Sequence, residues 1–336
     1  MFAVVAAPGP AQLVGADCGH NTAARFGGLF GLANQPFRGC DRGQVPAFGI
    51  GARGDAQPCG DRGDFGIRRA RSAGGIDLRE TDMDLPKNTF KAALIAGQQQ
   101  IGLWVSIANA GSAEAVATCG FDWVMVDTEH TPNDPAQVQA MLQAMAPYPT
   151  HAGVRPGWND AVEIKRIMDA GAQTILVPYV QTADEARAAV AAVMYPPHGL
   201  RGVSGLSRAS RYGAIPDYTA RANAEICLLV QVETKASLDQ IEAIAAVEGV
   251  DGIFIGPADL AASMGYPGQL GHPEVKAAIL DAVRRIKATG KAAGYLGSDQ
   301  AFLREVISAG CTFTAVGLDI GVMLAGMKAL VREWKG

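Results

Sequence analysis

The stretch that decides the fold runs from Ile226 to Asp259 and reads ICLLVQVETKASLDQIEAIAAVEGVDGIFIGPAD. A continuous apolar run of strand length occupies 226–232, and a second short run occupies 252–255. Between them, residues 237–246 carry apolar side chains at helical spacing, so the stretch predicts a strand–helix–strand unit. Because the apolar strand residues do not alternate with polar ones, we expect both strand faces to be buried, as in a parallel sheet covered by helices.

The same alternation continues through the rest of residues 88–336. Strand-like runs lie at 101–107, 122–126, 151–154, 173–177, 226–232, 252–255, 291–296 and 312–316. Helical patterns between them include 135–145, 161–170, 183–194, 237–246, 273–289 and 301–309, and a last one runs through 321–334. Eight strand-then-helix units in a chain of this length predict an α/β fold, the (β/α)₈ TIM barrel. The first strand is not followed by the glycine-rich turn of dinucleotide-binding folds, which argues against an open doubly wound sheet.

Residues 1–82 differ in composition from the rest of the chain. They contain 16 of the 41 glycines and 9 arginines but no lysine, and their apolar residues follow no helical or strand period. We expect this extension to be disordered, or to be upstream sequence read from an early start codon with Met83 as the natural start. An additional domain is the alternative. The barrel domain is placed at 83–336.

Composition excludes several classes of partner. A net charge of −4 gives no electrostatic reason to expect nucleic acid or an acidic membrane, and no apolar run approaches the roughly 20 residues of a membrane span. The six cysteines form no Cys-x-x-Cys pair, and Cys119, Cys227 and Cys311 are predicted to be small buried side chains in a reducing compartment. These features predict a cytoplasmic protein.

Polar residues gather where the predicted strands end. These residues are Asp127, Thr128, Glu129 and His130 after the second strand, Arg155 after the third, Gln231 and Glu233 at the fifth, and Ala258 and Asp259 after the sixth. The active sites of such barrels lie at the carboxyl ends of the strands. A solvated rim of charge is the alternative, but Arg155 and Glu233 continue buried strands, where a charge needs a partner.

These residue types indicate a chemistry. Glu233 and Asp259, on adjacent strands, offer two oxygen ligands to a hard divalent cation, which can chelate a 2-oxo acid and stabilise its enolate. Arg155 would stabilise the developing oxyanion, a contribution of about 3 kcal/mol for comparable donors. His130 is the natural base. A Schiff-base mechanism is the rival, but it needs a lysine at the barrel mouth. Lys291 opens its strand at the wrong end.

At these residues the sequence resembles the HpcH/HpaI aldolases, a family of metal-dependent class II pyruvate aldolases. The likeness covers about residues 88–334. The matching stretches include Gly102-Leu103-Trp104, Asp127-x-Glu129-His130, Val154-Arg155-Pro156, Trp158-Asn159-Asp160, Val230-Gln231-Val232-Glu233 and Ile255-Gly256-Pro257-Ala258-Asp259-Leu260. Each stretch is weak alone, and the combination is specific.

The resemblance implies roles for residues that bind metal and substrate. Glu233 and Asp259 correspond to the ligands of a divalent cation, Mg²⁺, Mn²⁺ or Co²⁺. Arg155 corresponds to the group that holds the keto oxygen. The amides around Ala258 and Asp259 would bind the pyruvate carboxylate, with Gln231 near the metal.

The resemblance also implies a shared active site. His130 corresponds to the catalytic base, acting directly or through a water molecule, and it pairs in the family with an aspartate that matches Asp169. Asp169 ends a helix before the fourth strand, at the wrong end of its own barrel, so it would have to come from a neighbouring subunit. A homo-oligomer, a trimer or hexamer with an exchanged last helix, is therefore expected.

The reaction expected is reversible cleavage of a 4-hydroxy-2-oxo acid into pyruvate and an aldehyde. A CoA-thioester lyase of the citrate lyase β-subunit type and a catalytically silent barrel are the alternatives. Two features bear on the aldehyde. Thr128 stands where many relatives have glycine. Arg208 and Arg211, in the long connection 195–225, could contact an acidic aldehyde or could equally be interface or surface residues.

Overall fold

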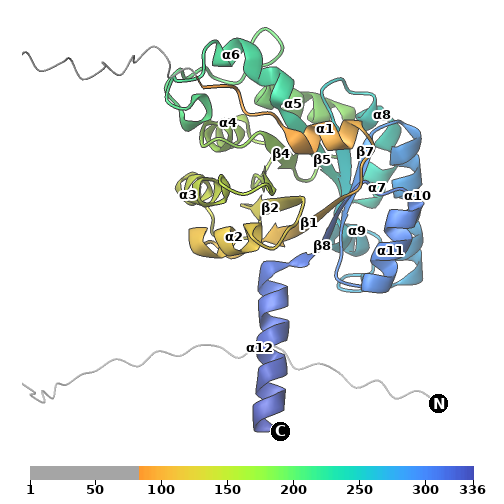
Figure 1. Cartoon of the computed structure of the whole chain (residues 1–336). Coiled ribbons are helices and arrows are strands. Elements are labelled where there is room, and N and C mark those ends of the chain that lie inside the picture. The colour runs from red at the N-terminus through yellow and green to blue at the C-terminus, as the bar shows by residue number, and fades with distance from the viewer. Residues whose placement is uncertain (1–82) are drawn as a thin grey trace, which may run out of the picture. The chain divides into compact units, whose positions relative to one another are not determined.

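The computed structural model describes residues 83–336, so the expectations for residues 1–82 lie outside the described residues. Within the described part, eight parallel strands close a barrel in the order of the sequence (Figure 1). The strands are β1 (Gln100–Val105), β2 (Trp123–Asp127), β3 (His151–Arg155), β4 (Thr174–Val177), β5 (Cys227–Val232), β6 (Gly252–Ile255), β7 (Ala292–Leu296) and β8 (Phe313–Leu318). The (β/α)₈ prediction is confirmed, and every predicted strand lies within two residues of an observed one at each end.

Helices surround the barrel, except the last one, which projects from one end of it (Figure 1). They are α1 (Thr89–Ile95), α2 (Ala110–Ala117), α3 (Pro135–Met145), α4 (Ala161–Asp169), α5 (Ala183–Val193), α6 (Tyr218–Arg221), α7 (Lys235–Leu238), α8 (Ile241–Ala245), α9 (Pro257–Ser263), α10 (Pro273–Ala288), α11 (Gln300–Ala309) and α12 (Asp319–Lys335), with 3₁₀ turns η2 (Arg208–Ser210) and η3 (Ala222–Glu225). The helix predicted at 237–246 is two short helices, because the chain leaves helical geometry at Gln240, with φ −106° and ψ 2°.

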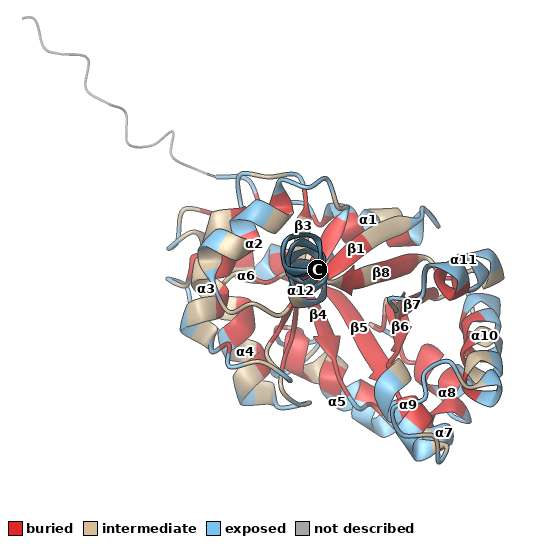
Figure 2. Ribbon diagram, turned by 90° about the horizontal axis from the view of Figure 1, so that it is seen from below, coloured by how far each residue is buried: buried red, intermediate tan, exposed pale blue. Residues whose placement is uncertain are grey.

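The barrel interior is filled by aromatic side chains. Trp104 packs against Phe254 with ring centroids 5.4 Å apart, and Trp123 packs against Phe313 at 6.0 Å. Glycine on the neighbouring strand makes room for these rings: a Cβ on Gly102 would lie 2.2 Å from the Trp123 ring. The buried strands are seen end-on in Figure 2. The rings therefore close the barrel and form a floor beneath its carboxyl end.

The long connection 195–225 lies at the amino end of the barrel. It builds a small apolar cluster around Tyr195 and Tyr218, and its Arg208 donates to the carbonyls of Leu142 and Ala170 where α3 and α4 end. Arg208 is buried. In Figure 1, α6 of this connection and α12 lie at opposite ends of the barrel. Arg208 therefore cannot contact a substrate at the carboxyl end of its own barrel.

The last helix, α12, leaves the carboxyl end of the barrel, and apart from Asp319 its residues are largely exposed. No helix among the described residues is both long enough and apolar enough to cross a bilayer. Of the three cysteines predicted to be buried, Cys227 and Cys311 are buried, whereas Cys119 is exposed. The prediction for Cys119 is wrong because this residue lies in the turn after α2 rather than on its inner face.

Candidate active site

A cavity of about 420 Å³ opens at the carboxyl end of the strands. Its walls come from loops after several strands and from the start of α12. The charged and polar residues that line it are Ser106, Asp127, His130, Thr131, Arg155, Gln231, Glu233, Asp259 and Ser298. Trp104 and Phe254 form its apolar floor. The cavity therefore has an apolar floor and walls that carry ionisable side chains.

Arg155 is held between two carboxylates. Its Nε donates to Asp127 Oδ1 at 3.0 Å, and its Nη2 donates to Asp127 Oδ2 at 2.8 Å. Its Nη1 lies 2.6 Å from Glu129 Oε2. The guanidinium also lies over the ring of Trp104, 4.9 Å from the ring centroid. Bidentate pairing fixes both the position and the plane of a guanidinium, so Arg155 is oriented before any substrate arrives.

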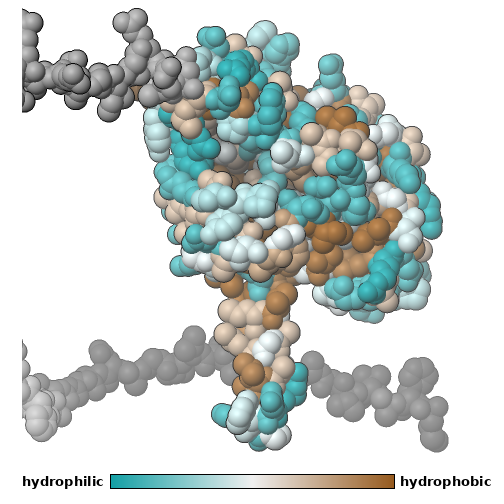
Figure 3. All heavy atoms as spheres, viewed as in Figure 1, coloured by the Kyte–Doolittle hydropathy of each residue, from teal (hydrophilic) through white to brown (hydrophobic). Residues whose placement is uncertain are grey.

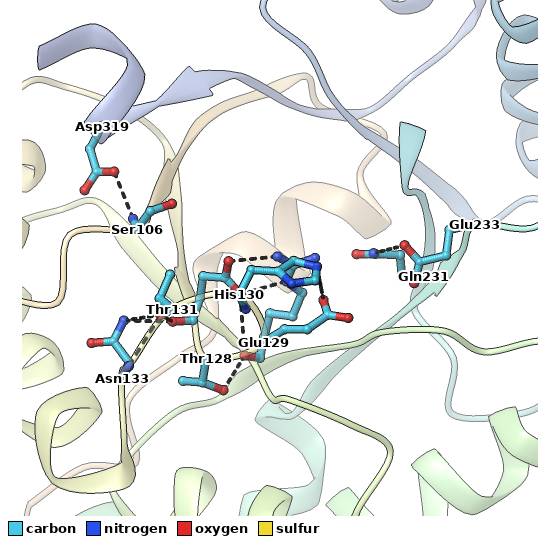
Figure 4. Close-up of polar contacts among 11 residues, drawn as sticks. Ser106, Thr128, Glu129, His130, Thr131, Asn133, Gln231, Glu233 and Asp319 are labelled. Carbon is cyan, nitrogen blue, oxygen red and sulfur yellow. Dashed lines mark hydrogen bonds and ion pairs between the residues drawn. The ribbon is translucent and has the colours of Figure 1, made fainter. Parts of the chain in front are cut away.

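The loop after β2, with Thr128 to Asn133 drawn in Figure 4, bonds back to Asp127. Asp127 Oδ1 accepts from the amide of Glu129 at 3.0 Å, and the Asp127 carbonyl accepts from Asn133 Nδ2 at 2.7 Å. The adjacent His130 is exposed, and its Nε2 lies 3.7 Å from Glu129 Oε2. Thr128 Oγ1 donates to the Arg155 carbonyl at 2.7 Å. Thr128 therefore braces β3 and does not line the cavity.

Burial raises the pKa of Glu129 to about 7. Arg155 opposes this shift, while the negative charges of Asp127 and Asp259 add to it. Burial is therefore the main reason that the neutral form of Glu129 is favoured, and the neighbouring carboxylates add to this effect.

Glu233 is buried at the end of β5 with both oxygens engaged. Its Oε1 accepts from the amide of Tyr179 at 2.8 Å, and its Oε2 accepts from Gln231 Nε2 at 2.5 Å (Figure 4). Burial raises the pKa of Glu233 to about 7. The two hydrogen bonds oppose the shift, and the charges of Glu129 and Asp259 add to it. The other amide atom of Gln231, Oε1, is buried with no hydrogen-bond partner among the described residues.

The loop after β6 enters α9 directly and completes the cavity. Pro257 occupies the first turn, where its missing N–H costs nothing. Ala258 and Asp259 follow in the same turn, and both line the cavity. Amides in the first turn of a helix have no intrahelical acceptor, so those of Ala258 and Asp259 are free to bind an anion.

Negative charge exceeds positive charge around this cavity. Asp127, Glu129, Glu233 and Asp259 stand against the single guanidinium of Arg155 and an exposed histidine. No group of three or more histidine, cysteine, aspartate or glutamate side chains in the described part of the chain is arranged to hold a metal by itself. A cation bound here would therefore have fewer than three of these side chains as ligands and would complete its coordination with other oxygen atoms, water and substrate, as Mg²⁺ commonly does.

The structure gathers most of the predicted site residues. Those that line one cavity are His130, Arg155, Gln231, Glu233, Ala258 and Asp259. Asp169 is not among them. It ends α4 at the opposite end of the barrel, where its Oδ1 accepts from Arg201 Nη2 at 3.0 Å. Within one chain it does not reach His130, in keeping with the expectation that only a neighbouring subunit could bring them together.

Sequence reasoning missed the two carboxylates that hold Arg155. Asp127 and Glu129 lie at the end of the second predicted strand, but the sequence pattern alone assigns them no role. Their signal was the pairing of adjacent parallel strands, because Asp127 and Arg155 are register partners on β2 and β3. Opposite charges at such a position predict an ion pair.

Taken together, the barrel and its acid-lined cavity define a (β/α)₈ enzyme with an active site at the carboxyl ends of the strands. Residues 100–325 match the HpcH/HpaI aldolase/citrate lyase family. The chain belongs to this family and is an aldolase.

Two relatives and one solved structure illustrate the match. The chain is 63% identical over 252 residues to a hydroxypyruvate/pyruvate aldolase of Sagittula stellata, covering 75% of this chain and 100% of that protein. It is 53% identical over 249 residues to a 4-hydroxy-2-oxo-heptane-1,7-dioate aldolase of Salmonella paratyphi B, covering 74% and 95%. A crystal structure of a family protein from Burkholderia cenocepacia is 37% identical with a TM-score of 0.72, covering 74% and 100%.

Proposed function

We propose that the chain reversibly cleaves a 4-hydroxy-2-oxo acid into pyruvate and an aldehyde, with a divalent cation held by Glu233 and Asp259. The observation that carries the proposal is the arrangement of one fixed guanidinium, Arg155, among surplus carboxylates in a single cavity. The name of the Sagittula stellata relative supports pyruvate as the product, and that of the Salmonella relative supports a 4-hydroxy-2-oxo acid as the substrate.

The residues present fit a divalent cation. Carboxylates whose pKa values are raised by burial and by one another, as at Glu233, are stabilised in their charged form when a cation enters. Gln231 Oε1, buried and without a partner, offers a further oxygen nearby. Mg²⁺, Mn²⁺ and Co²⁺ all suit such oxygen ligands. When bound, the cation would act as a Lewis acid that stabilises the negative charge of the pyruvate enolate.

The chain's own residues account for the remaining steps. The amides of Ala258 and Asp259 would bind the substrate carboxylate, and Arg155 would donate to the keto oxygen from N–H groups that its carboxylate partners leave free. His130, at the mouth of the cavity, would accept the proton of the C4 hydroxyl as the C3–C4 bond breaks and the aldehyde leaves. The electron pair of the broken bond moves to C3 and the keto oxygen, and a proton delivered to C3 completes pyruvate.

Exchange of the methyl protons of pyruvate in D₂O, followed by NMR with Mg²⁺ present, tests the enolisation step without an aldehyde. Wild-type protein should exchange the protons, and Glu233→Gln should lose the exchange. Glu305→Gln, a change at an exposed glutamate of α11, is the matched control and should exchange normally. Failure of wild-type protein to exchange would refute the proposal. Pyruvate release from a panel of hydroxy-oxo acids and CoA esters separates an aldolase from a CoA-thioester lyase.

We propose further that the active form is a homo-oligomer, a trimer or hexamer. The apolar residues exposed on α12 are Val322, Met323, Leu324, Met327, Leu330, Val331 and Trp334 (Figure 3). Large apolar side chains exposed together on one helix usually mark an interface. A second copy that receives α12 would cover it, and a neighbour could bring Asp169 to His130. Leu330→Glu should lower the mass measured by light scattering, whereas Lys328→Glu, on the same helix, should leave it unchanged.

A further inference from the structure

Asp319, the first residue of α12, accepts hydrogen bonds from the segment that follows β1. Asp319 Oδ1 accepts from the amide of Ser106 at 2.9 Å, and Oδ2 accepts from the amide of Ile107 at 3.1 Å (Figure 4). Asp319 is 7% exposed. A carboxylate that binds two successive amides of a distant segment fixes both the position and the direction of that segment.

The segment fixed in this way forms one wall of the active-site cavity. Ser106, Leu318 and Ile320 line the cavity beside this contact. Trp104, two residues before Ser106, supports the guanidinium of Arg155. The regular pairing of β1 with β8 is interrupted between Gly102 and Trp104. The hydrogen bonding between β1 and β8 is therefore irregular just before Ser106, and the Asp319 carboxylate supplies hydrogen bonds to the segment that follows.

Asp319 Oδ1 also accepts from the amide of Ile320 in its own helix at 2.7 Å, but helix capping does not explain its bonds to Ser106 and Ile107. Asp160, which caps α4, accepts from the amides of Val162 and Glu163 in its own helix. Leu318 occupies the capping position of α12 and makes no side-chain bond there. Both amides lie just after β1 and are more than 200 residues away from Asp319 in the sequence. The carboxylate joins two parts of the barrel rather than simply closing one helix.

We infer that Asp319 is a positioning residue for the reaction: it holds the β1 wall, and with it Trp104 and Arg155, in the place that the keto acid requires. Because α12 begins at the same residue, the direction of α12 and the shape of the cavity are linked. This inference rests on the proposed function, which supplies the reaction that is positioned.

The test compares Asp319→Ala and Asp319→Asn with Asp160→Ala and Asp160→Asn. All four replace an aspartate that accepts from backbone amides, but only Asp319 accepts from the segment that lines the cavity. The rate and the KM of pyruvate proton exchange are measured with the full-length protein and Mg²⁺, together with Tm and oligomer mass. A displacement of about 1 Å at a reacting group costs up to about 100-fold, so Asp319→Ala should lower the rate at least about tenfold.

The conservative variant separates positioning from folding. Asp319→Asn keeps one oxygen acceptor, so it should recover part of the rate. Both Asp160 variants should exchange within about twofold of wild type, at similar cost to Tm. The inference is overturned if folded Asp319→Ala or Asp319→Asn matches its Asp160 counterpart in rate and KM. If wild-type protein shows no exchange, the proposed function fails, and the inference fails with it.

Discussion

Gly256 offers the sharpest test of how the cavity is built. A Cβ at this position would lie 2.3 Å from Glu233 Oε2, 2.8 Å from Glu233 Cβ and 2.9 Å from Gln231 Nε2. Ordinary contacts between such atoms begin near 3.4 Å, so Gly256→Ala must push the Glu233 carboxylate away by about 1 Å. The backbone angles of Gly256, φ −85° and ψ 103°, suit alanine, so the substitution adds no backbone strain.

The expected loss follows from this displacement. Moving Glu233 would disturb its bonds from Gln231 and from the Tyr179 amide, and losing the partners of a metal ligand typically lowers metal affinity about 10- to 100-fold. Titration calorimetry with Mn²⁺ measures the affinity, and pyruvate proton exchange measures the consequence for catalysis. Gly317→Ala is the control, because its Cβ would meet only ordinary contacts at 3.7 Å and beyond. Equal Mn²⁺ affinity in Gly256→Ala and wild type would refute the proposed role of Glu233.

Three further predictions follow. Arg155→Met leaves the carboxylates of Asp127 and Glu129 unpaired, so the free energy of unfolding in urea should fall by about 3 kcal/mol; no loss would show that the ion pairs contribute nothing. Burial lowers the pKa of His151 from 6.5 to about 4. The unfolded chain therefore binds a proton below pH 6.5 that the folded chain does not bind until near pH 4. As the pH is lowered from 6.5 to 4, the free energy of unfolding should fall by at most about 1.4 kcal/mol per pH unit. His151→Gln should flatten this dependence in urea unfolding. Arg208→Met breaks two bonds to carbonyls and should cost about 2 kcal/mol of stability in the same assay, while the KM for an acidic aldehyde stays unchanged; a raised KM would contradict its distance from the cavity.

The sequence predicts the strands of this protein well, because strands buried on both faces form short apolar runs with clear limits. The cavity was also predictable, since residues at the carboxyl ends of parallel strands must meet. Helices were harder to predict. The stretch 237–246 has one continuous apolar pattern but contains two helices, and the predicted patterns do not include α1, α2, α6 and α9. Each of these six helices has eight residues or fewer, too short for a periodic pattern to emerge.

Contacts between distant side chains could not be predicted from spacing. The hydrogen bonds between Asp319 and the segment after β1 join residues more than 200 positions apart, so no local sequence pattern indicates them. The sequence left open whether Arg208 contacts an acidic aldehyde or is an interface or surface residue, but its loop follows a helix and so lies at the amino end of the barrel. Asp169 remains a prediction for the assembled protein, because its distance from His130 depends on how subunits meet.

The first turn of α9 has a consequence for how this enzyme could diversify. Under the proposed roles, Asp259 holds the cation while its own amide and that of Ala258 hold the substrate carboxylate. One rigid turn, started by Pro257, then carries both tasks. Any mutation that shifts this turn alters both tasks together, so selection for new aldehydes would be confined to side chains contributed by other strands.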